Sequence, residues 1–320
     1  MIRKQTPATS TPYLTWFARS LDRYGAEGAR GESRAVLGYA TGYGAAALEP
    51  FIRSLRSHYN GPAVLVVDDR QDVRRLLAAF GVSAADALPS TGWSPHPVVA
   101  RFAAYDRWLR ARPWVSHALL TDVRDVVFQG DPFAGAAARV EVYAEGRGRL
   151  ADHPFTMKHL RALAGMAVAE TISDRPSLCV GTIVGPAADL SRLCRVLLAL
   201  AAIPRSEVGA SFGADQAAFN LAVHLGLVDV DIRPNYGRVA TIGAGDGGAF
   251  EPGEAGAILN PDGSASPIVH QYDRHAHLSE LVRQRWSRSG HSAFAARRKS
   301  PADRWKGLLA SLRRRIPELR

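Results

Sequence analysis

Short apolar runs alternate with amphipathic segments along most of the chain. The runs have the length of buried strands, whereas the amphipathic segments repeat apolar residues every three or four positions. The runs predict strands at 34–41, 63–69, 118–120, 140–145, 178–185 and 228–234, and a short strand or turn at 268–275. The segments predict helices at 46–59, 72–82, 99–113, 189–202 and 215–226, with loops at 83–97 and 243–257. This alternation indicates an α/β fold with a mostly parallel sheet and helices on both faces.

The chain divides into three parts by this pattern. Residues 1–32 are a weakly patterned N-terminal extension, residues 33–280 carry the expected strands and helices, and residues 281–320 are a basic tail. Of the 320 residues, 47% are hydrophobic and 22% are charged, which is usual for a globular protein. We therefore expect one large α/β domain between two terminal segments.

The N-terminal sequence and the two cysteines indicate the cellular compartment of the protein. The N-terminus has no apolar core typical of a secretory signal, and no apolar run reaches the roughly 18 to 20 residues of a membrane span. Cys179 and Cys194 lie in apolar surroundings, so we expect buried, unreactive thiols, which suit a reducing compartment. These features predict a cytoplasmic protein.

The positive charge is concentrated at one end of the chain. Residues 283–320 contain 12 Arg and Lys against two acids, which equals the whole net charge of +10. A nucleic-acid-binding surface would not be confined in this way, so no nucleic-acid partner is expected. In 300–317 an apolar helical stripe lies among basic residues, which suits attachment of residues 297–320 to an anionic inner membrane face. A solvated or docked C-terminal helix is the alternative.

Two acids interrupt the apolar segment HALLTDVRDVVFQGDPF at residues 117–133. A carboxylate taken out of water must be paired or hold a metal. Asp122 and Asp125 follow a strand, at the edge where open α/β sheets bind ligands, and carboxylates suit Mg²⁺ or Mn²⁺. The alternative is structural, in which Asp122 caps the turn and Asp125 pairs with a base such as Arg124.

This segment resembles the metal-binding DxD region of GT-A-type glycosyltransferases, although the two acids here are one residue further apart. The resemblance covers roughly residues 34–278 and implies a GT-A-like, Rossmann-like sheet. It further implies a divalent cation (Mn or Mg), a nucleotide-diphosphate sugar donor, and a glycan or lipid-linked acceptor. The order of motifs is closer to the retaining families, in which the departing phosphate oxygen takes the acceptor proton.

The resemblance also assigns roles to individual residues. It implies Asp125, Asp122 and His270 as metal ligands, and Asp215 and Gln216 as the catalytic pair at a helix start. Asp125 is the expected direct ligand, and Asp122 would otherwise meet the ribose or a metal-bound water. The implied donor-binding residues, from nucleoside to sugar, are Tyr39, Thr41, Asp68, Asp69, Arg101, Asp122, Gly181 and Thr182.

Simpler interpretations of some of these residues remain open. His270 would be an ordinary buried histidine, and Asp215 would be a helix N-cap, a position that Asp favours. His275 and His277 are expected in solvent or behind the site. Asp131-Pro132 is typical of a turn.

Other functional classes also remain open. The segment GYGAAA, with Gly42 and Gly44 between a strand and a helix, fits a dinucleotide-binding fingerprint for NAD(P) or FAD. A nucleotidyltransferase would share the sheet and the metal, but no Lys lies between residues 5 and 157 to hold a phosphate. A non-catalytic nucleotide-sugar-binding or membrane-binding protein is the non-enzymatic alternative.

Overall fold

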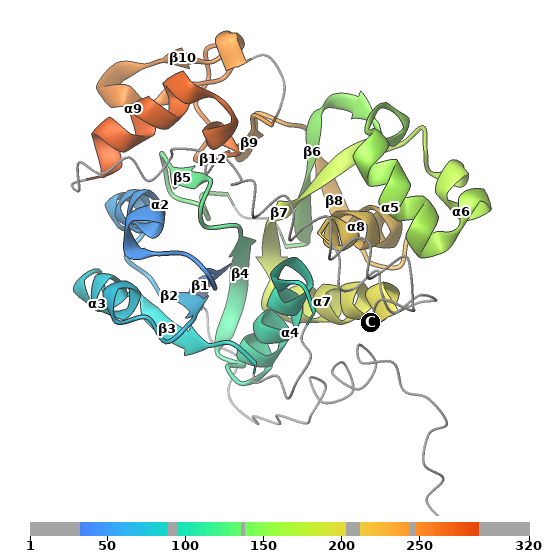
Figure 1. The fold of residues 1–320 in the computed structure, drawn as a ribbon, viewed down its shortest axis with the longest axis horizontal. Helices are drawn as coiled ribbons and strands as arrows, with labels where there is room; N and C mark the ends of the chain where they lie inside the picture. The colour runs from blue at the N-terminus through green and yellow to red at the C-terminus, as the bar shows by residue number, and fades with distance from the viewer. Residues whose placement is uncertain (1–32, 89–94, 136–137, 203–211, 244–246, 288–320) are drawn as a thin grey trace, which may run out of the picture. The chain divides into compact units, whose positions relative to one another are not determined.

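The centre of the protein is a seven-stranded sheet in the order β3-β2-β1-β4-β7-β6-β8 (Figure 1). The computed structural model describes residues 33–88, 95–135, 138–202, 212–243 and 247–287. The strands of the sheet are β1 (Ser33–Tyr39), β2 (Ala63–Val67), β3 (Ser83–Asp86), β4 (Val115–Thr121), β6 (Val140–Arg149), β7 (Pro176–Pro186) and β8 (Val230–Arg233). Strand β7 runs antiparallel to both of its neighbours, and the other pairs are parallel. The predicted α/β class with a mostly parallel sheet is confirmed.

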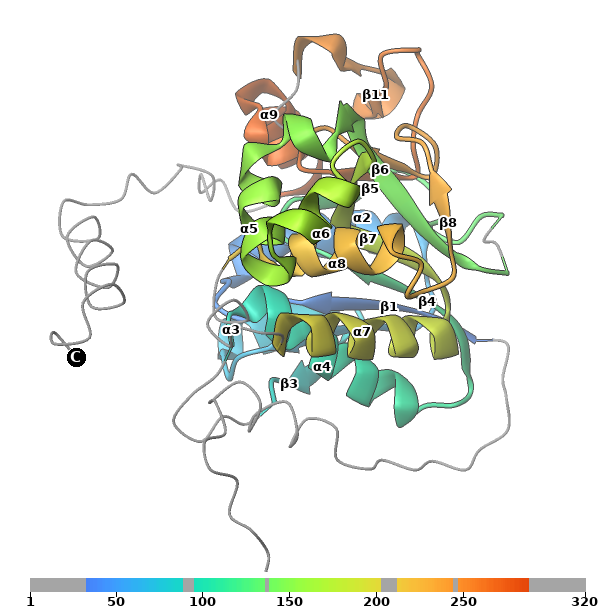
Figure 2. The same ribbon diagram turned by 90° about the vertical axis from the view of Figure 1, so that its right-hand side faces the viewer.

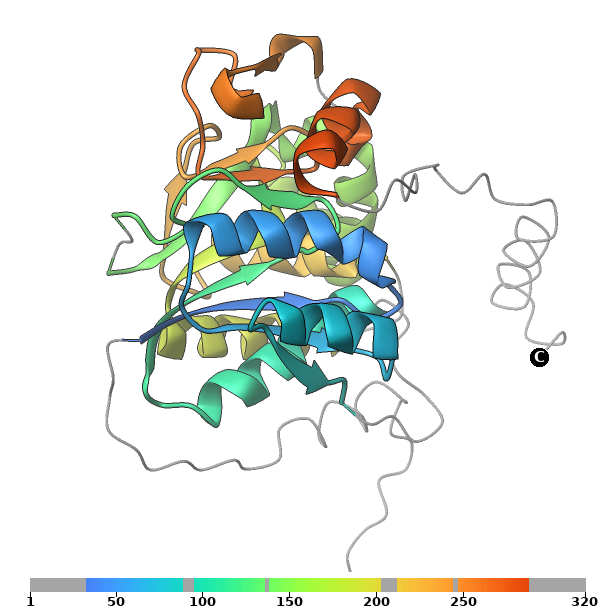
Figure 3. The ribbon, with the colours of Figure 1, turned by 90° about the vertical axis from the view of Figure 1, so that its left-hand side faces the viewer.

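Helices cover both faces of this sheet. On one side lie α4 (Pro97–Arg110) and α7 (Ala187–Ala202), which Figure 2 shows side by side below β1. On the other side lie α2 (Ala45–His58) and α3 (Gln71–Ala79), seen nearest the viewer in Figure 3. The strands are apolar on both faces, and successive residues of a strand pack into the apolar clusters on opposite faces of the sheet. Ala35 and Leu37 pack with α4 and α7, whereas Val36 packs with α2.

A smaller three-stranded sheet lies beside the carboxyl end of β4. Its order is β5-β12-β9, formed by β5 (Val126–Phe128), β12 (Ile268–His270) and β9 (Val239–Thr241). The strands β10 (Glu251–Pro252) and β11 (Ile258–Leu259) form a hairpin, and β11 and the helix α9 (Ala276–Trp286) contribute to a separate apolar cluster. This sheet brings the end of the domain against the turn that follows β4.

The predicted helices and the long strands are found, and the differences lie in short or exposed elements. Strand β3 forms where a loop was predicted. It was not predicted because this strand lies at an exposed edge of the sheet, and its sequence SAAD has no run of large apolar residues. Helices α5 (Pro154–Ala164) and α6 (Met166–Thr171) occupy a segment for which no element was predicted. The 3-10 turns Gly247–Ala249 and Glu254–Gly256 and the strand β10 lie within the predicted loop 243–257.

The predicted terminal segments lie largely outside the described residues. This applies to the N-terminal extension 1–32, to residues 288–320 of the basic tail, and hence to the expected membrane contact of 297–320. The expected domain boundary at 280/281 falls inside α9. Within the described part of the chain, no helix combines the length and the apolar character that crossing a bilayer requires. Cys179 and Cys194 are both buried and unpaired, as predicted.

Candidate metal centre and its pocket

The turn between β4 and β5 carries both acids and is held from two sides. The backbone N–H of Asp122 donates to the carbonyl of Gly181 on β7 at 2.7 Å, and the N–H of Gln271 donates to the carbonyl of Asp125 at 2.8 Å. Val123 points inward between them and is buried against Gly38 of β1. The D-x-x-D spacing therefore forms a tight turn that directs two carboxylates to the same side.

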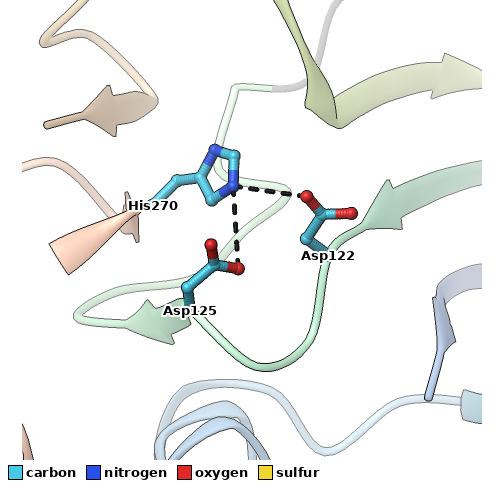
Figure 4. A group of neighbouring side chains, drawn as sticks. All are labelled: Asp122, Asp125 and His270. Carbon is cyan, nitrogen blue, oxygen red and sulfur yellow. Dashed lines mark ion pairs between the residues drawn. The ribbon is translucent and has the colours of Figure 1, made fainter. Parts of the chain in front are cut away.

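His270 completes the group because β12 pairs with β5 (Figure 4). Its Nε2 lies 3.5 Å from Oδ2 of Asp122 and 3.8 Å from Oδ1 of Asp125. The potential ligand atoms of the three residues all lie within 4.8 Å of one another. The structure thus brings together the three residues predicted as metal ligands.

The donor set and its spacing fit a divalent cation. Two ligand atoms that each lie about 2.1 Å from one ion at right angles are about 3 Å apart, so small side-chain adjustments would close this site. The His270 side chain is fully buried, and its Nε2 has no hydrogen-bond partner among the described residues. A buried imidazole nitrogen without a partner is costly, and a cation between it and the two carboxylates would satisfy it.

A second contact fixes which nitrogen of His270 faces the acids. The Nδ1 atom lies 3.4 Å from Sγ of Cys179, on the opposite side of the ring. Partners of this kind orient metal-binding imidazoles and set their tautomer. Sequence reasoning assigned Cys179 only to the core, and no local pattern places it beside a residue so distant in the chain.

The centre has space because position 181 lacks a side chain. A Cβ at Gly181 would lie 2.3 Å from Cε1 of His270 and 2.7 Å from Oδ2 of Asp122. Such contacts are far inside van der Waals distance. The glycine that the resemblance placed in the sugar pocket therefore lies directly against the proposed metal ligands.

The electrostatics of the three ligands are coupled. Burial alone would raise the pKa of Asp122, but Arg101 and His270 lower it to about 2. Burial raises the pKa of Asp125, and the Asp122 carboxylate adds to this effect. Burial disfavours the imidazolium, but Cys179 and the two acids more than offset this and raise the pKa of His270. A divalent cation bound between the three groups would supply positive charge beside both carboxylates, and it would bind the imidazole in its neutral form.

Arg101 joins the metal centre to the start of α8 (Ala214–His224). One terminal nitrogen bonds Asp122, and the other donates to Oδ2 of Asp215 at 2.7 Å. The guanidinium is buried, and so is the Asp215 carboxylate. Arg101 was expected to contact a donor diphosphate, but in this structure both of its terminal nitrogens bind carboxylates.

Asp215 and Gln216 lie in the first turn of α8, as expected. Gly213, with φ of +94°, is the N-cap residue, so Asp215 is not the cap and its side chain serves the ion pair with Arg101. The Gln216 amide donates to Oε2 of Glu145 at 2.7 Å. The simpler prediction of an N-cap for Asp215 is therefore wrong.

Two further arginines border the centre. Arg124 was predicted only as a structural partner of Asp125, and its Nη2 lies 3.9 Å from Oδ2 of that residue, whereas Arg274 was not predicted for the site. Arg124 lies between the acids and donates to Asp273 at 2.8 Å. Arg274 follows in the chain, and its Nε lies 3.9 Å from Asp273. Both side chains are more than two-fifths exposed and line the same pocket. The signal available in the sequence was their proximity to Asp125 and His270.

A pocket of about 600 Å³ opens over the metal centre. Of the residues predicted for the site, those lining it are Tyr39, Arg101, Asp122, Asp125, Gly181, Asp215, Gln216 and His270. Thr41, Asp68, Asp69 and Thr182 are not among the lining residues. Thr182 is buried in β7, whereas Asp68 and Asp69 are exposed at the end of β2. Eight of the predicted residues thus line the pocket, and the other four do not.

The glycine-rich turn after β1 has its own internal contacts. Gly42 adopts φ of +83°, and its N–H donates to Oδ2 of Asp68 at 2.5 Å. The fingerprint Gly44 lies at the N-cap of α2. In this conformation the Asp68 carboxylate already accepts from the Gly42 N–H, which a bound pyrophosphate would otherwise need as a donor.

The chain was also compared with known proteins. No protein-family model matches it, and no curated protein is similar enough to match.

Proposed function

We propose that this protein is a metal-dependent glycosyltransferase that moves a sugar from a nucleotide-diphosphate donor to a glycan or lipid-linked acceptor. The observation that carries the proposal is the convergence of Asp122, Asp125 and His270 at the carboxyl end of β4. Two carboxylates and one imidazole suit Mn²⁺, and also Mg²⁺, which commonly bind substrate phosphates. Open α/β sheets bind their ligands at this edge.

The size and lining of the pocket support a ligand of this class. A volume of about 600 Å³ lies within the usual range for a cofactor-sized molecule. Tyr39 and Tyr43 line the pocket at the end of β1, where a flat nucleobase can lie against an aromatic ring. Arg124 and Arg274 supply positive charge close to the acids. A diphosphate beside the metal ligands would therefore meet two cationic side chains.

The reaction breaks the bond between the anomeric carbon and the phosphate oxygen. A bound divalent cation would offset the negative charge that develops on the leaving diphosphate. Arg124 and Arg274 contribute to the same stabilisation from the pocket wall. The acceptor hydroxyl oxygen bonds to the anomeric carbon, and its proton passes to the departing phosphate oxygen.

Retention of configuration is the proposed stereochemical course. An inverting enzyme needs a carboxylate base beside the acceptor hydroxyl. Asp215, the carboxylate of the expected catalytic pair, is 7% exposed and binds Arg101 at 2.7 Å, so it is poorly placed to accept a substrate proton. Its proposed role is instead to hold Arg101, and thereby Asp122, in position.

Thermal stability of the purified protein against a panel of nucleotide-sugars, each with and without Mn²⁺, tests the proposal. Ligands that bind the folded state raise the melting temperature. We expect a rise with one class of nucleotide-sugar only when Mn²⁺ is present, and its loss in Asp125→Ala. The matched control, Asp174→Ala, changes an exposed acid outside the pocket and should behave as wild type. A rise with NAD(P) that is independent of metal would overturn the proposal.

Product analysis separates transfer from related chemistry. A glycosyltransferase releases a nucleoside diphosphate, whereas a nucleotidyltransferase releases pyrophosphate. Incubation of the stabilising nucleotide-sugar with Mn²⁺ should yield the nucleoside diphosphate, by transfer or by slow hydrolysis. Binding with no turnover in the presence of a full acceptor panel would indicate a non-catalytic binding protein.

A further inference from the structure

Two exposed aromatic rings stand at the rim of the pocket that contains the metal centre. Phe155, on α5, is 52% exposed, and Phe212, just before α8, is 63% exposed. Their ring centroids are 5.9 Å apart with an angle of 49° between the planes, and both residues line the pocket. Large apolar side chains exposed together beside a pocket indicate a binding surface.

The chain holds these rings in place. Phe212 packs edge-on against His96 at 5.8 Å, and Phe155 packs against His159 at 4.5 Å. A Cβ at Gly213 would lie 2.6 Å from the Phe155 ring, so this glycine lets the ring rest against the backbone at the start of α8. The rings are therefore packed against neighbouring groups, and both side chains remain more than half exposed.

Polar groups lie in the same pocket as the rings. Gln216 and Glu145 form a hydrogen-bonded pair at 2.7 Å, and Asp152 and His153 also line the pocket. The carboxylate of Glu145 retains acceptor capacity beyond this bond, and so does the amide oxygen of Gln216. An acyl chain would cover such groups without bonding them, which costs free energy.

A pyranose ring matches both features. Its axial C–H groups form an apolar face that stacks on aromatic rings, and its hydroxyl groups bond carboxylates and amides. We infer that Phe155 and Phe212 form a saccharide-binding subsite for the sugar residue of the acceptor, with Glu145 and Gln216 as hydroxyl partners. The inference rests on the proposed function and names the recognised part of the acceptor as a glycan, not a lipid chain.

Saturation-transfer NMR with n-octyl glycosides of glucose, galactose, mannose and N-acetylglucosamine tests the subsite in the presence of Mg²⁺. These probes carry a sugar and an alkyl chain in one molecule, so the saturated protons identify the recognised part. We expect at least one glycoside to show saturation at its ring protons. Phe155→Ala and Phe212→Ala should each weaken its affinity by about two- to tenfold, the range expected for an aromatic contact.

Two further variants sharpen the test. Phe155→Leu keeps an apolar side chain without a ring face, so it should lose affinity like Phe155→Ala, whereas Phe155→Trp should retain it. Met166→Ala removes an equally exposed apolar side chain, 62% exposed and outside the pocket, and should bind as wild type does. Saturation confined to the octyl chain, full retention in Phe155→Leu, or no saturation with any probe would overturn the inference.

The donor experiment keeps the two proposals separate. Phe155→Ala should preserve the Mn²⁺-dependent rise in melting temperature with the nucleotide-sugar, because the ring lies at the rim and does not bind the metal ligands. Absence of ring-proton saturation with every glycoside in the wild-type protein, together with an intact donor response, rejects the subsite alone. Absence of the donor response in the wild-type protein rejects the proposed function.

Discussion

The Nε2 atom of His270 lies 3.8 Å from Oδ1 of Asp125, because the register between β12 and β5 sets His270 opposite Val126. The two residues come from distant parts of the sequence and meet only through strands of three residues. His270 is fully buried and Asp125 is 8% exposed. Short paired strands thus hold an imidazole and a carboxylate at the floor of the pocket.

Substitution of Gly181 by Ala should abolish tight Mn²⁺ binding while leaving the fold largely intact. The added methyl group would displace the His270 ring or the Asp122 carboxylate, which lie 2.3 and 2.7 Å from its position. We expect Mn²⁺ affinity to fall at least tenfold, on the order of the losses seen when metal ligands are misplaced. Isothermal titration calorimetry measures the affinity directly.

The control for this variant is Gly237→Ala, which changes an exposed glycine whose new Cβ would have only Pro234 O, at 3.9 Å, within 4 Å. It should bind Mn²⁺ as wild type does. Equal affinities for the Gly181 variant and this control would show that the cation does not bind between Asp122 and His270.

Cys179 should matter for metal affinity through His270, and not as a ligand. Cys179→Ser keeps a polar partner for Nδ1 and should lower Mn²⁺ affinity only slightly. Cys179→Val removes that partner and should lower affinity about tenfold, the smaller end of the range for groups that orient metal-binding histidines. Mn²⁺ titrations of both variants measure these affinities. Cys194→Val, which changes a buried cysteine that does not contact His270, is the control and should bind Mn²⁺ as wild type does. Equal affinity in Cys179→Ser and Cys179→Val would contradict an orienting role.

Arg101→Met should destabilise the protein strongly. It leaves the buried Asp215 carboxylate without its partner, a change that typically costs about 3 to 5 kcal/mol. The midpoint of urea unfolding reports the loss, and Lys158→Met, at an exposed position on α5, should change stability by less than about 0.5 kcal/mol. A loss below about 1 kcal/mol in Arg101→Met would mean that the ion pair is not a structural link.

Much of the central sheet could be predicted because its longer strands are recognisable as short apolar runs in the sequence. The runs that became β1, β2, β4 and β7 are apolar at nearly every position, since both faces of the sheet are covered. Their relative directions could not be predicted from these runs. Strand β7 pairs antiparallel with β4 and β6, but a buried apolar strand has the same composition whether it runs parallel or antiparallel to its neighbours.

The candidate site also contains residues that the sequence predicted and contacts that it did not. Asp122 and Asp125 were visible because charged residues interrupt an apolar run, and His270 followed from the resemblance. The contact of Arg101 with Asp215 and that of Cys179 with His270 depend on tertiary packing, and no local pattern encodes them. No helix was predicted around Phe155, and the exposure of this side chain beside the pocket is evident only in the structure.

The proposed function requires one divalent cation to bind between Asp122, Asp125 and His270. Titration of the protein with Mn²⁺, monitored by electron paramagnetic resonance, measures this binding. Free aqueous Mn²⁺ gives a sharp signal that decreases on binding. We expect one tight site per chain in the wild type, with affinity at least tenfold weaker in Asp125→Asn and unchanged in Asp174→Asn. A wild-type protein that leaves the Mn²⁺ signal undiminished, or an Asp125→Asn variant that binds as tightly, would contradict it.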